Sequence, residues 1–436
     1  MGETPSSQTV STKLQRIAEA ARAAPEMAFT TLAHHIDIEW LREAHRRTRK
    51  DGATGVDGQT AEQYEAKLEE NLRSLLDRAK SGTYRAPPVR RVHIPKGDGG
   101  SRPIGIPTFE DKVLQRAVAM LLEAIYEQSF RDFSYGFRPG RSAHQALEVL
   151  QNDAVRRAGA WVLEVDIRKF FDTLDHAHLM EILRRRVRDG VLLRLIGKWL
   201  NAGVLEGLQL SYPEAGTPQG GAISPLLANI YLHEVLDEWF VCTVRACLRD
   251  QATLIRFADD FVILFSRKED AERVMDVLPK RFGKYGLTLH PDKTRLVSFQ
   301  RPDKAPPDAP PATFNLLGFT HFWGRSRKGR WTVKKSTAKD RFSRAIKRVR
   351  EWCRVHRHEP IREQWQALRR KLHGHYGYYG VTSNMVALAR FRWEVVSAWW
   401  KWLARRSHAG KTWDSMRGLL KGLPLPAPRI VHRYGT

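Results

Sequence analysis

The chain has 436 residues, which is more than one ordinary hydrophobic core organises, so its length predicts two or three packed domains. Hydrophobic residues make up 42% of it and charged residues 28%, a balance that is typical of a globular protein and excludes wholesale disorder. The formal net charge of +25 points to a polyanionic partner.

Helical periodicity dominates the first half of the chain. The segments with apolar residues at helical spacing are Ile36–Arg49, Thr60–Ala79, Glu110–Ser129, Ser142–Arg157 and Thr173–Leu200. Between the second and third of these, residues 86–107 are basic and interrupted by proline and glycine, so we expect extended structure there. The short alternating segment Trp161–Ile167 predicts a strand.

The second half begins with a loop rich in glycine and proline, Gly216–Ile223. Ser224 is the expected N-cap and Pro225 the first residue of the helix that follows. The remaining predicted elements are a helix over Leu226–Phe240, a β-hairpin over Leu254–Phe265, a helix over Glu269–Tyr285, a strand over Thr294–Phe299, an exposed proline-rich loop over Arg301–Ala312 and a strand over Phe314–Phe322. A helical C-terminus completes the chain. This order predicts an α/β or α+β fold with an appended helical domain.

Basic charge is concentrated in residues 325–436, which hold 28 Lys and Arg against 6 Asp and Glu. The preceding 324 residues hold 45 and 42, and eight of the thirteen tryptophans lie in the basic stretch. Cations interleaved with aromatic rings suit phosphate neutralisation and base stacking. A solvated helix surface is the alternative, but such surfaces usually mix both signs of charge. We therefore favour nucleic-acid binding.

No secretion or membrane signal is evident, because no stretch approaches the ~18 apolar residues that span a bilayer and residues 1–12 are polar. We expect a cytoplasmic protein with no membrane partner. The three cysteines, Cys242, Cys247 and Cys353, form no CxxC pair. This spacing predicts buried thiols in a reducing compartment and neither zinc nor disulfides.

Adjacent carboxylates mark the predicted hairpin, where apolar strands flank Asp259 and Asp260. Two such acids repel each other unless a cation lies between them, although aspartate is also a common turn residue. A second acid, Asp166, ends the strand that begins at Trp161. Carboxylates from two strand ends of one sheet can hold two Mg²⁺ ions ~3.5–4 Å apart for phosphoryl transfer. Oxygen ligands without His or Cys favour Mg²⁺ over zinc.

Seven ordered blocks resemble those of the bacterial group II intron-encoded reverse transcriptase/maturase family. They are Lys96-Gly-Asp-Gly-Gly-Ser-Arg102-Pro-Ile-Gly-Ile-Pro107, Phe133-Ser-Tyr-Gly-Phe-Arg-Pro-Gly-Arg-Ser142, Asp166–Asp172, Gly216-Thr-Pro-Gln-Gly-Gly-Ala-Ile-Ser-Pro225, Phe257-Ala-Asp-Asp260, Leu287-Thr-Leu-His-Pro-Asp-Lys-Thr294 and Asn315-Leu-Leu-Gly-Phe319. The family usually has tyrosine where Phe257 stands, a change that removes no metal ligand. The resemblance implies a right-hand polymerase with fingers and palm, followed by an all-helical thumb and maturase domain.

The resemblance also implies roles for individual residues. Asp166, Asp259 and Asp260 would be the catalytic carboxylates, and the Ile167 carbonyl would be an additional ligand of the two Mg²⁺ ions. The incoming deoxynucleoside triphosphate would contact Lys96, Arg102, Phe171, Gln219, Gly220 and Lys293. Phe171 would exclude a 2′-hydroxyl, and Lys293 is a candidate general acid for pyrophosphate. Phe171 as ordinary core, and Lys96 and Lys293 as ordinary surface lysines, remain open alternatives.

The basic C-terminal stretch resembles the family's thumb (Lys334–His358) and maturase domain (Leu372–Val381 and Phe391–Arg406). Candidate RNA contacts are Arg138, Arg141, Arg369, Arg370 and Lys371. For His373, His375 and His408 we favour RNA contact or packing over metal binding. Because the chain ends at Thr436 without a Cys-rich segment, we expect no DNA-nicking module.

The expected domains are an N-terminal helical extension (1–85), fingers and palm (86–324) and the thumb and maturase domain (325–436). The expected partners are group II intron RNA, an RNA template with a DNA primer, and target DNA. A free-standing host reverse transcriptase, or a splicing cofactor without polymerase activity, are the alternatives. The oligomeric state is open.

Overall fold

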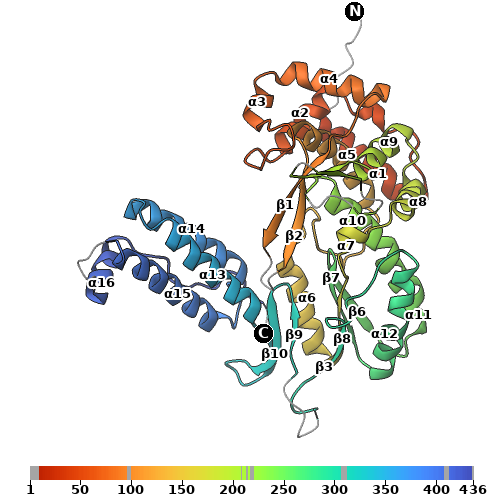
Figure 1. Ribbon diagram of the computed structural model, residues 1–436. Helices are drawn as coiled ribbons and strands as arrows, with labels where there is room; N and C mark the ends of the chain where they lie inside the picture. Colours follow the sequence, from red (N-terminus) through yellow and green to blue (C-terminus); the bar gives the residue numbers. More distant parts are fainter. Residues whose placement is uncertain are drawn as a thin grey trace, which may run out of the picture. The chain divides into compact units, whose positions relative to one another are not determined.

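The computed structural model describes residues 9–95, 100–207, 209–212, 215–216, 220–305, 312–406 and 412–434 (Figure 1). The chain forms two compact units: residues 1–142, 165–261 and 272–294 make up unit 1, and residues 143–164, 262–271 and 295–436 make up unit 2. The boundaries cross strands β3 (Gly159–Asp166) and β7 (Asp260–Phe265). Asp166, Asp259 and Asp260 consequently all lie in unit 1. The predicted domain boundaries at residues 85 and 324 stay a prediction.

The first helices of unit 1 pack around α5 (Phe109–Tyr126), which is buried along most of its length. They are α1 (Val10–Ala23), the 3₁₀ turn η1 (Ala33–His35), α2 (Ile38–Arg47), α3 (Ala61–Glu65) and α4 (Leu68–Ser81). Trp40 of α2 is fully buried, and its indole N–H donates to the Ala117 carbonyl of α5 at 2.9 Å. Asp37 and Thr60 cap α2 and α3 as side-chain acceptors, which satisfies backbone N–H groups that have no partner within the helix.

A four-stranded sheet of order β2-β1-β4-β5 follows. Its strands are β1 (Val89–Pro95), β2 (Ser101–Ile106), β4 (Val204–Glu206) and β5 (Gln209–Ser211). β1 and β2 are antiparallel, with Ile94 opposite Arg102. The extended, basic segment predicted at residues 86–107 is thus a hairpin, and Arg102 lies near its tip.

The rest of unit 1 is mainly helical. Its helices are α7 (Phe170–Thr173), α8 (His176–Arg186), α9 (Gly190–Leu200), α10 (Ser224–Leu232), the π-helical segments η2 (His233–Glu238) and η3 (Phe240–Val244), α11 (Arg245–Cys247) and α12 (Lys268–Gly283), whose first turn belongs to unit 2. α10 is buried on all sides, as an apolar helix requires.

The sheet that carries the acidic motifs has the order β6-β7-β3-β8. β6 spans Ala252–Phe257 and β8 spans Arg295–Gln300. The two central strands, β7 and β3, are largely buried, which explains their dense apolar sequences. Each carries an aspartate at one end: Asp166 ends β3 and Asp260 begins β7.

Unit 2 contains a second sheet, of order β11-β10-β9, beside α6 (Ala143–Arg156). Its strands are β9 (Phe314–Leu316), β10 (Phe319–Arg325) and β11 (Trp331–Thr337). Lys335 of β11 is buried, donates to Gln151 of α6 and lies 3.8 Å from the centre of the Tyr434 ring. The end of the described chain is therefore packed onto α6 and β11.

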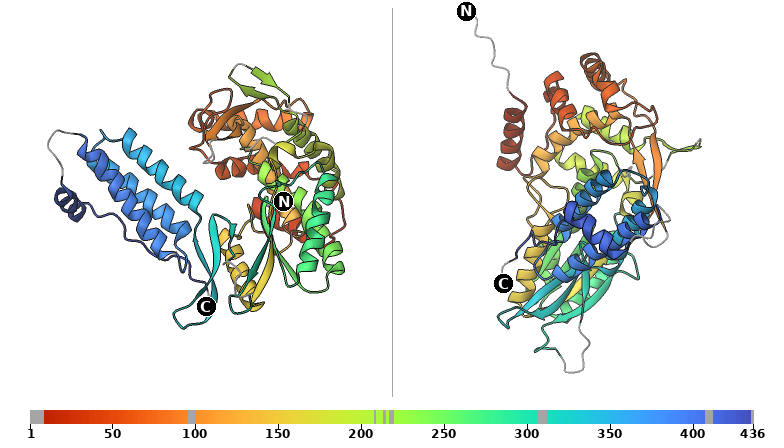
Figure 2. Two further views of the ribbon diagram at one scale, coloured as in Figure 1. Left: turned by 60° about the horizontal axis from the view of Figure 1, so that its bottom comes forward. Right: turned by 90° about the vertical axis from the view of Figure 1, so that its left-hand side faces the viewer.

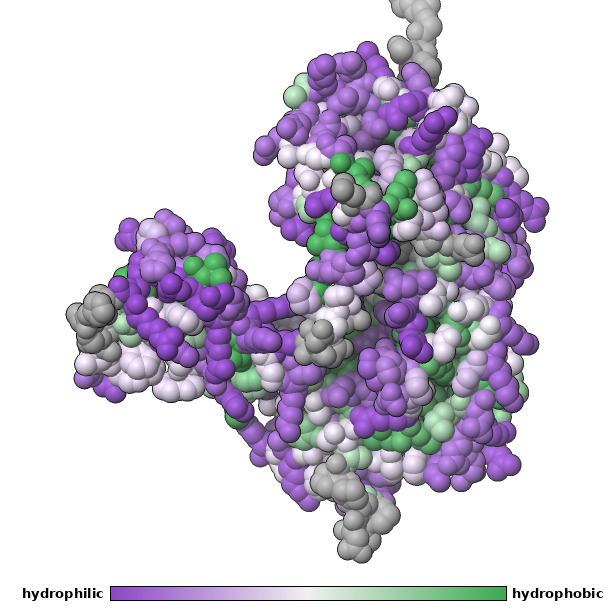
Figure 3. All heavy atoms as spheres, in the orientation of Figure 1, coloured by the Kyte–Doolittle hydropathy of each residue, from purple (hydrophilic) through white to green (hydrophobic). Residues whose placement is uncertain are grey.

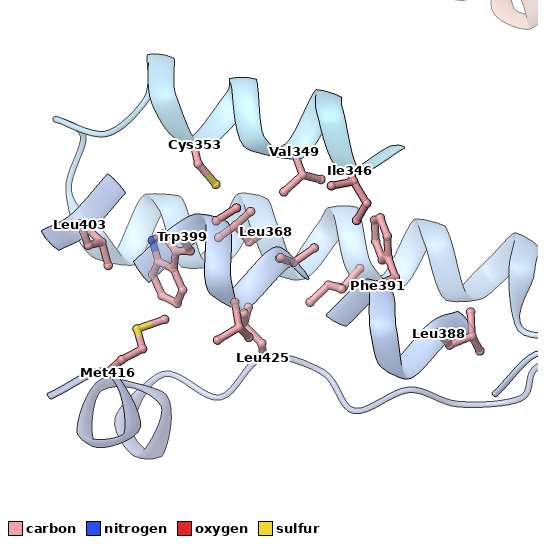
Figure 4. Packing of buried hydrophobic residues seen from close by; sticks show 14 of the residues in the cluster. Ile346, Val349, Cys353, Leu368, Leu388, Phe391, Trp399, Leu403, Met416 and Leu425 are labelled. Atoms are coloured by element: carbon pink, nitrogen blue, oxygen red, sulfur yellow. The ribbon is translucent and has the colours of Figure 1, made fainter. Parts of the chain in front are cut away.

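Four helices complete the chain: α13 (Lys339–Val355), α14 (Ile361–Tyr379), α15 (Met385–Ala404) and α16 (Trp413–Gly422). The first three lie side by side (Figure 1 and Figure 2). Figure 4 shows Cys353 of α13, Leu368 of α14 and Trp399 of α15 pointing into one buried cluster, with Met416 of α16 beneath them. This apolar seam leaves the polar faces of the helices outward.

Five predicted elements need correction. The segment Thr60–Ala79 is two helices, α3 and α4, separated by a turn at Ala66 and Lys67. The segment Thr173–Leu200 is mainly two helices. α8 ends at Arg186, and α9 begins at Gly190, where Asp189 caps it by accepting from the Val191 and Leu192 N–H groups. The strand predicted at Phe314–Phe322 is a pair of strands that turns at Leu317 and Gly318, both with positive φ. The C-terminal stretch is not all helical, since β11 lies within it. Ser224 is the first helical residue rather than the N-cap, which is Ile223.

The cysteines are free thiols, as predicted, but only Cys353 is buried; Cys242 and Cys247 are exposed. Among the residues described, no helix is both long enough and apolar enough to cross a membrane.

Candidate active site

The candidate catalytic hairpin joins β6 to β7 through a turn at Ala258 and Asp259. Ala258 has a φ of 56°, a left-handed conformation that residues other than glycine seldom adopt. Asp259 is half-buried in the turn, and Asp260 is exposed at the start of β7. The hairpin prediction is confirmed, and its two acids lie at the bend.

Asp166 reaches the same region from the end of β3. Its carbonyl accepts from the His290 N–H at 2.8 Å, and Ile167 pairs with Leu289 in an isolated β-bridge. These backbone contacts bring in the loop that carries Lys293. The Lys293 ammonium lies 2.9 Å from the Asp166 carboxylate, and both side chains are partly exposed.

The pKa of Asp259 responds to two of the other predicted site residues, Asp166 and Arg102. Burial raises the pKa of Asp259, and the Asp166 carboxylate raises it further. The charges of Arg102 and Arg256 act in the opposite direction and lower that pKa. Asp166, Asp259 and Arg102 therefore share one electrostatic environment.

A magnesium site can be tested against this arrangement. Within the described part of the chain, no group of three or more His, Cys, Asp or Glu side chains lies close enough to form a ready metal cluster. The donors nevertheless fit Mg²⁺, because Asp166, Asp259, Asp260 and the Ile167 carbonyl offer only oxygen. The mutual repulsion that raises the pKa of Asp259 is also what a bound cation relieves.

Of the predicted nucleotide contacts, Lys96 and Gln219 lie outside the described residues. Arg102 is exposed on β2. Gly220 has a φ of 130°, and a Cβ added there would lie 2.5 Å from the Gly105 carbonyl oxygen, so glycine is required where this loop meets β2. Phe171 is half-buried and packs edge-on against Phe170.

Arg138, predicted to contact RNA, lies in the interior instead. Its guanidinium pairs with Glu127 at 2.9 Å and donates to the carbonyls of Arg131 and Ser134. Because all three guanidinium nitrogens donate hydrogen bonds within the protein, Arg138 stabilises this loop. We therefore do not propose it as an RNA contact. Arg141 is paired with Asp132 and remains partly exposed.

Arg369, Arg370 and Lys371 are exposed on α14. Arg369 lies over the Trp365 ring at 5.5 Å, and Lys371 lies over the Trp352 ring at 5.2 Å. His375 on the same helix stacks on Phe391 at 3.6 Å, and burial lowers its pKa to about 4. His375 is therefore a packing residue, one of the two roles expected for it. His408 lies outside the described residues.

Sequence reasoning missed a basic groove between α13 and α15. Its lining includes Lys347, Arg350, Arg354, Arg390, Lys401 and Trp402. Arg357, Lys401 and Arg405 all lie within 6 Å of the Trp402 ring. The spacing of Lys347, Arg350 and Arg354 on one helical face was the available signal. Figure 3 shows mostly hydrophilic residues over the visible surface of these helices.

Comparison with known proteins adds independent information. Residues 94–321, just over half of the chain, match the family described as reverse transcriptase (RNA-dependent DNA polymerase). Protein YkfC of Escherichia coli is 35% identical over 326 residues, which are 66% of this chain and 84% of that protein. Group II intron-encoded protein LtrA of Lactococcus lactis is 40% identical over 228 residues, which are 51% of this chain and 37% of LtrA.

A protein encoded in the cob intron of Schizosaccharomyces pombe is 42% identical over 165 residues, which are 38% of this chain and 20% of that protein. The matches to LtrA and to the cob intron protein thus cover well under two thirds of those proteins. Residues 94–321, which match the family, contain both strand ends with their acids, strand β2 and the loop before α10. The chain belongs to the reverse transcriptase (RNA-dependent DNA polymerase) family, in the group that includes group II intron-encoded reverse transcriptases and maturases.

Proposed function

We propose that Asp166, Asp259 and Asp260 catalyse RNA-templated DNA synthesis with two Mg²⁺ ions. The observation that carries this proposal is that two neighbouring strands, β3 and β7, each carry an aspartate at one end. Burial and the Asp166 carboxylate both raise the pKa of Asp259 in the turn before β7. A half-buried carboxylate that a second, partly exposed carboxylate repels is poorly stable without a cation. The membership of the chain in the reverse transcriptase family supports the same reaction.

When bound, the two ions would activate the primer 3′-hydroxyl and neutralise the departing pyrophosphate. Asp166, Asp259, Asp260 and the Ile167 carbonyl would hold them. Lys293 neutralises Asp166 through its ammonium at 2.9 Å. From that position it would donate a proton to pyrophosphate once the carboxylate is otherwise engaged.

The remaining groups bind and select the nucleotide. Arg102 on the β1–β2 hairpin, with Lys96, would neutralise the triphosphate through charge-assisted hydrogen bonds. Gly220, whose backbone lies against the Gly105 carbonyl of β2, would line the nucleotide together with Gln219, its neighbour in sequence. Phe171 would lie under the sugar and exclude a 2′-hydroxyl.

We assign group II intron RNA as the partner of the basic C-terminal helices. Support comes from the relatives encoded by introns and from the exposed cations beside tryptophan on α14. The groove lined by Lys347, Arg350 and Trp402 offers a second basic surface. In this proposal the protein stabilises the folded intron during splicing and then copies it at a DNA target during retrohoming.

Primer extension on an RNA template tests the polymerase site. Asp259→Asn should abolish extension and leave RNA binding intact, because it removes metal charge and no phosphate contact. Asp276→Asn, at an exposed position of α12, is the matched control and should extend as the wild type does. Extension by Asp259→Asn at the wild-type rate would remove the site assignment.

Splicing of a flanking intron tests the RNA partner. The double variant Asp259→Asn with Asp260→Asn should still accelerate splicing at low Mg²⁺, because the RNA itself performs the splicing chemistry. Changing Arg369, Arg370 and Lys371 to Gln should slow splicing more than primer extension. If the wild-type protein leaves the splicing rate unchanged, a free-standing reverse transcriptase is the better assignment.

A further inference from the structure

A buried ion pair lies next to the catalytic turn. The side chains of Arg256 in β6 and Asp237 in η2 have no exposed surface. The guanidinium binds the carboxylate at two points, with Nε to Oδ1 at 2.8 Å and Nη2 to Oδ2 at 2.5 Å. Burial alone would raise the pKa of Asp237, but Arg256 holds it below its ordinary value. Apolar residues often replace such a pair without loss of stability, so stability alone does not account for it.

The third nitrogen of Arg256 connects this pair to the turn. Nη1 donates to the Ala258 carbonyl at 3.1 Å and to the Asn229 side-chain oxygen at 3.0 Å. The Ala258 carbonyl belongs to the planar peptide that leads into Asp259. Fixing this carbonyl fixes that peptide plane and hence the direction in which Asp259 leaves the backbone.

Asn229 connects Arg256 to a second segment of the chain, around Gly136. Its amide donates to the Gly136 carbonyl at 2.6 Å. Gly136 lies so close to the turn that an added Cβ would be 2.3 Å from the Ala258 nitrogen. The neighbouring backbone is paired as well: the Tyr135 N–H donates to the Arg256 carbonyl, and the Arg256 N–H donates to the Phe133 carbonyl. The left-handed Ala258 is thus enclosed by groups with fixed partners.

We propose that Asp237, Arg256 and Asn229 are positioning residues that hold the Ala258–Asp259 peptide, and through it the Asp259 carboxylate, in the orientation required for nucleotidyl transfer. The inference rests on the proposed role of Asp259. Displacing a reacting group by about 1 Å can reduce a rate about 100-fold. A network that leaves Ala258 no alternative position prevents such a displacement.

Single-turnover extension of a DNA primer on an RNA template tests the proposal. We expect Asn229→Leu to lower the maximal rate about 10-fold and the double variant Arg256→Met with Asp237→Leu to lower it about 100-fold. The Mg²⁺ concentration for half-maximal rate should rise about 10-fold in both, as for residues that support metal ligands. Affinity for the primer–template duplex should stay within about twofold of wild type, and thermal unfolding measures the folded fraction.

A second pair of variants avoids the ion pair altogether. Gly136→Ala adds a methyl group against the Ala258 backbone, whereas Gly197→Ala adds the same methyl to α9, where nothing lies within 4 Å. The first should lower the maximal rate and raise the Mg²⁺ requirement. The second should leave both unchanged.

Wild-type rates and Mg²⁺ requirements in the Asn229, Gly136 and double variants overturn the positioning role, provided that Asp259→Asn is inactive. Rate losses that follow only the folded fraction, with an unchanged Mg²⁺ requirement, overturn it too. Activity retained by Asp259→Asn removes the proposed site itself, which is a separate result.

Discussion

Phe171 is the residue at which a single ring would decide which sugar enters the site. It is half-buried and packs against the buried Phe170. Truncation to alanine frees space without removing a charge. We expect Phe171→Ala to raise the ratio of ribonucleotide to deoxynucleotide incorporation about 10-fold or more, which corresponds to a loss of about 1.4 kcal/mol or more of steric discrimination against the 2′-hydroxyl.

The ratio of the two incorporation efficiencies is the measurement. Phe170→Leu is the matched control, because it trims a neighbouring ring inside the core and should alter stability more than sugar selection. An unchanged ratio for Phe171→Ala would show that this ring is ordinary core.

At the scale of the element, α14 and α15 are joined by the stacking of His375 on Phe391. Burial lowers the pKa of His375 to about 4. The unfolded chain binds a proton at His375 as pH falls through about 6.5, whereas the folded chain does so only near 4. This contribution to stability is therefore complete above about pH 6.5 and is lost progressively from there toward pH 4.

His375→Phe should remove that loss, because phenylalanine keeps the stack and cannot be protonated. The free energy of unfolding, measured by denaturant titration at pH 7 and pH 5, should fall less in the variant than in wild type, by about 1–2 kcal/mol. His373→Phe, two residues earlier on the same helix, controls for the added ring. Equal pH dependence in wild type and His375→Phe contradicts the prediction.

At the scale of the whole molecule, basic charge is concentrated in residues 325–436, about a quarter of the sequence. If residues 325–436 carry RNA binding, the logarithm of the association constant should fall steeply with the logarithm of salt concentration. Each neutralised phosphate contributes about 0.7–0.9 to the slope. Changing Arg369, Arg370 and Lys371 to Gln should therefore reduce the slope by about 2.

The matched control changes three exposed cations of unit 1, Arg16, Arg73 and Lys280, to Gln. It removes the same formal charge and should leave the slope nearly unchanged. Deleting residues 325–436 is a poorer test, because it would also remove β11 from its pairing with β10 and Lys335 from its hydrogen bond to Gln151 of α6. Equal slopes in both triple variants would mean that the basic excess is only a solvated surface.

The hydrophobic pattern predicted helices and strands correctly where a single period, either 2 or 3.6 residues, dominated the segment. The hairpin around Asp259 and the helices near Glu110 and Ser142 follow from alternation and from 3.6-residue spacing. The errors arise from backbone turns and strand pairing, which the hydrophobic period does not report. Positive φ at Leu317 and Gly318 splits one predicted strand, and β11 is held by pairing with β10 although two lysines, Lys334 and Lys335, lie within it.

The sequence by itself determined the family, the acidic strand ends and the basic C-terminus, because each depends on residue type and order along the chain. Only the tertiary structure decided what the polar residues contact. Arg138 lies in a basic block and Arg256 directly precedes the acidic one, yet burial against Glu127 and Asp237 turns both side chains inward. Their partners are distant in sequence or lie on other elements, and a contact of that kind leaves no periodic trace. The support of Asp259 by Asn229 and Gly136 became visible for the same reason, since folding alone brings those three segments together.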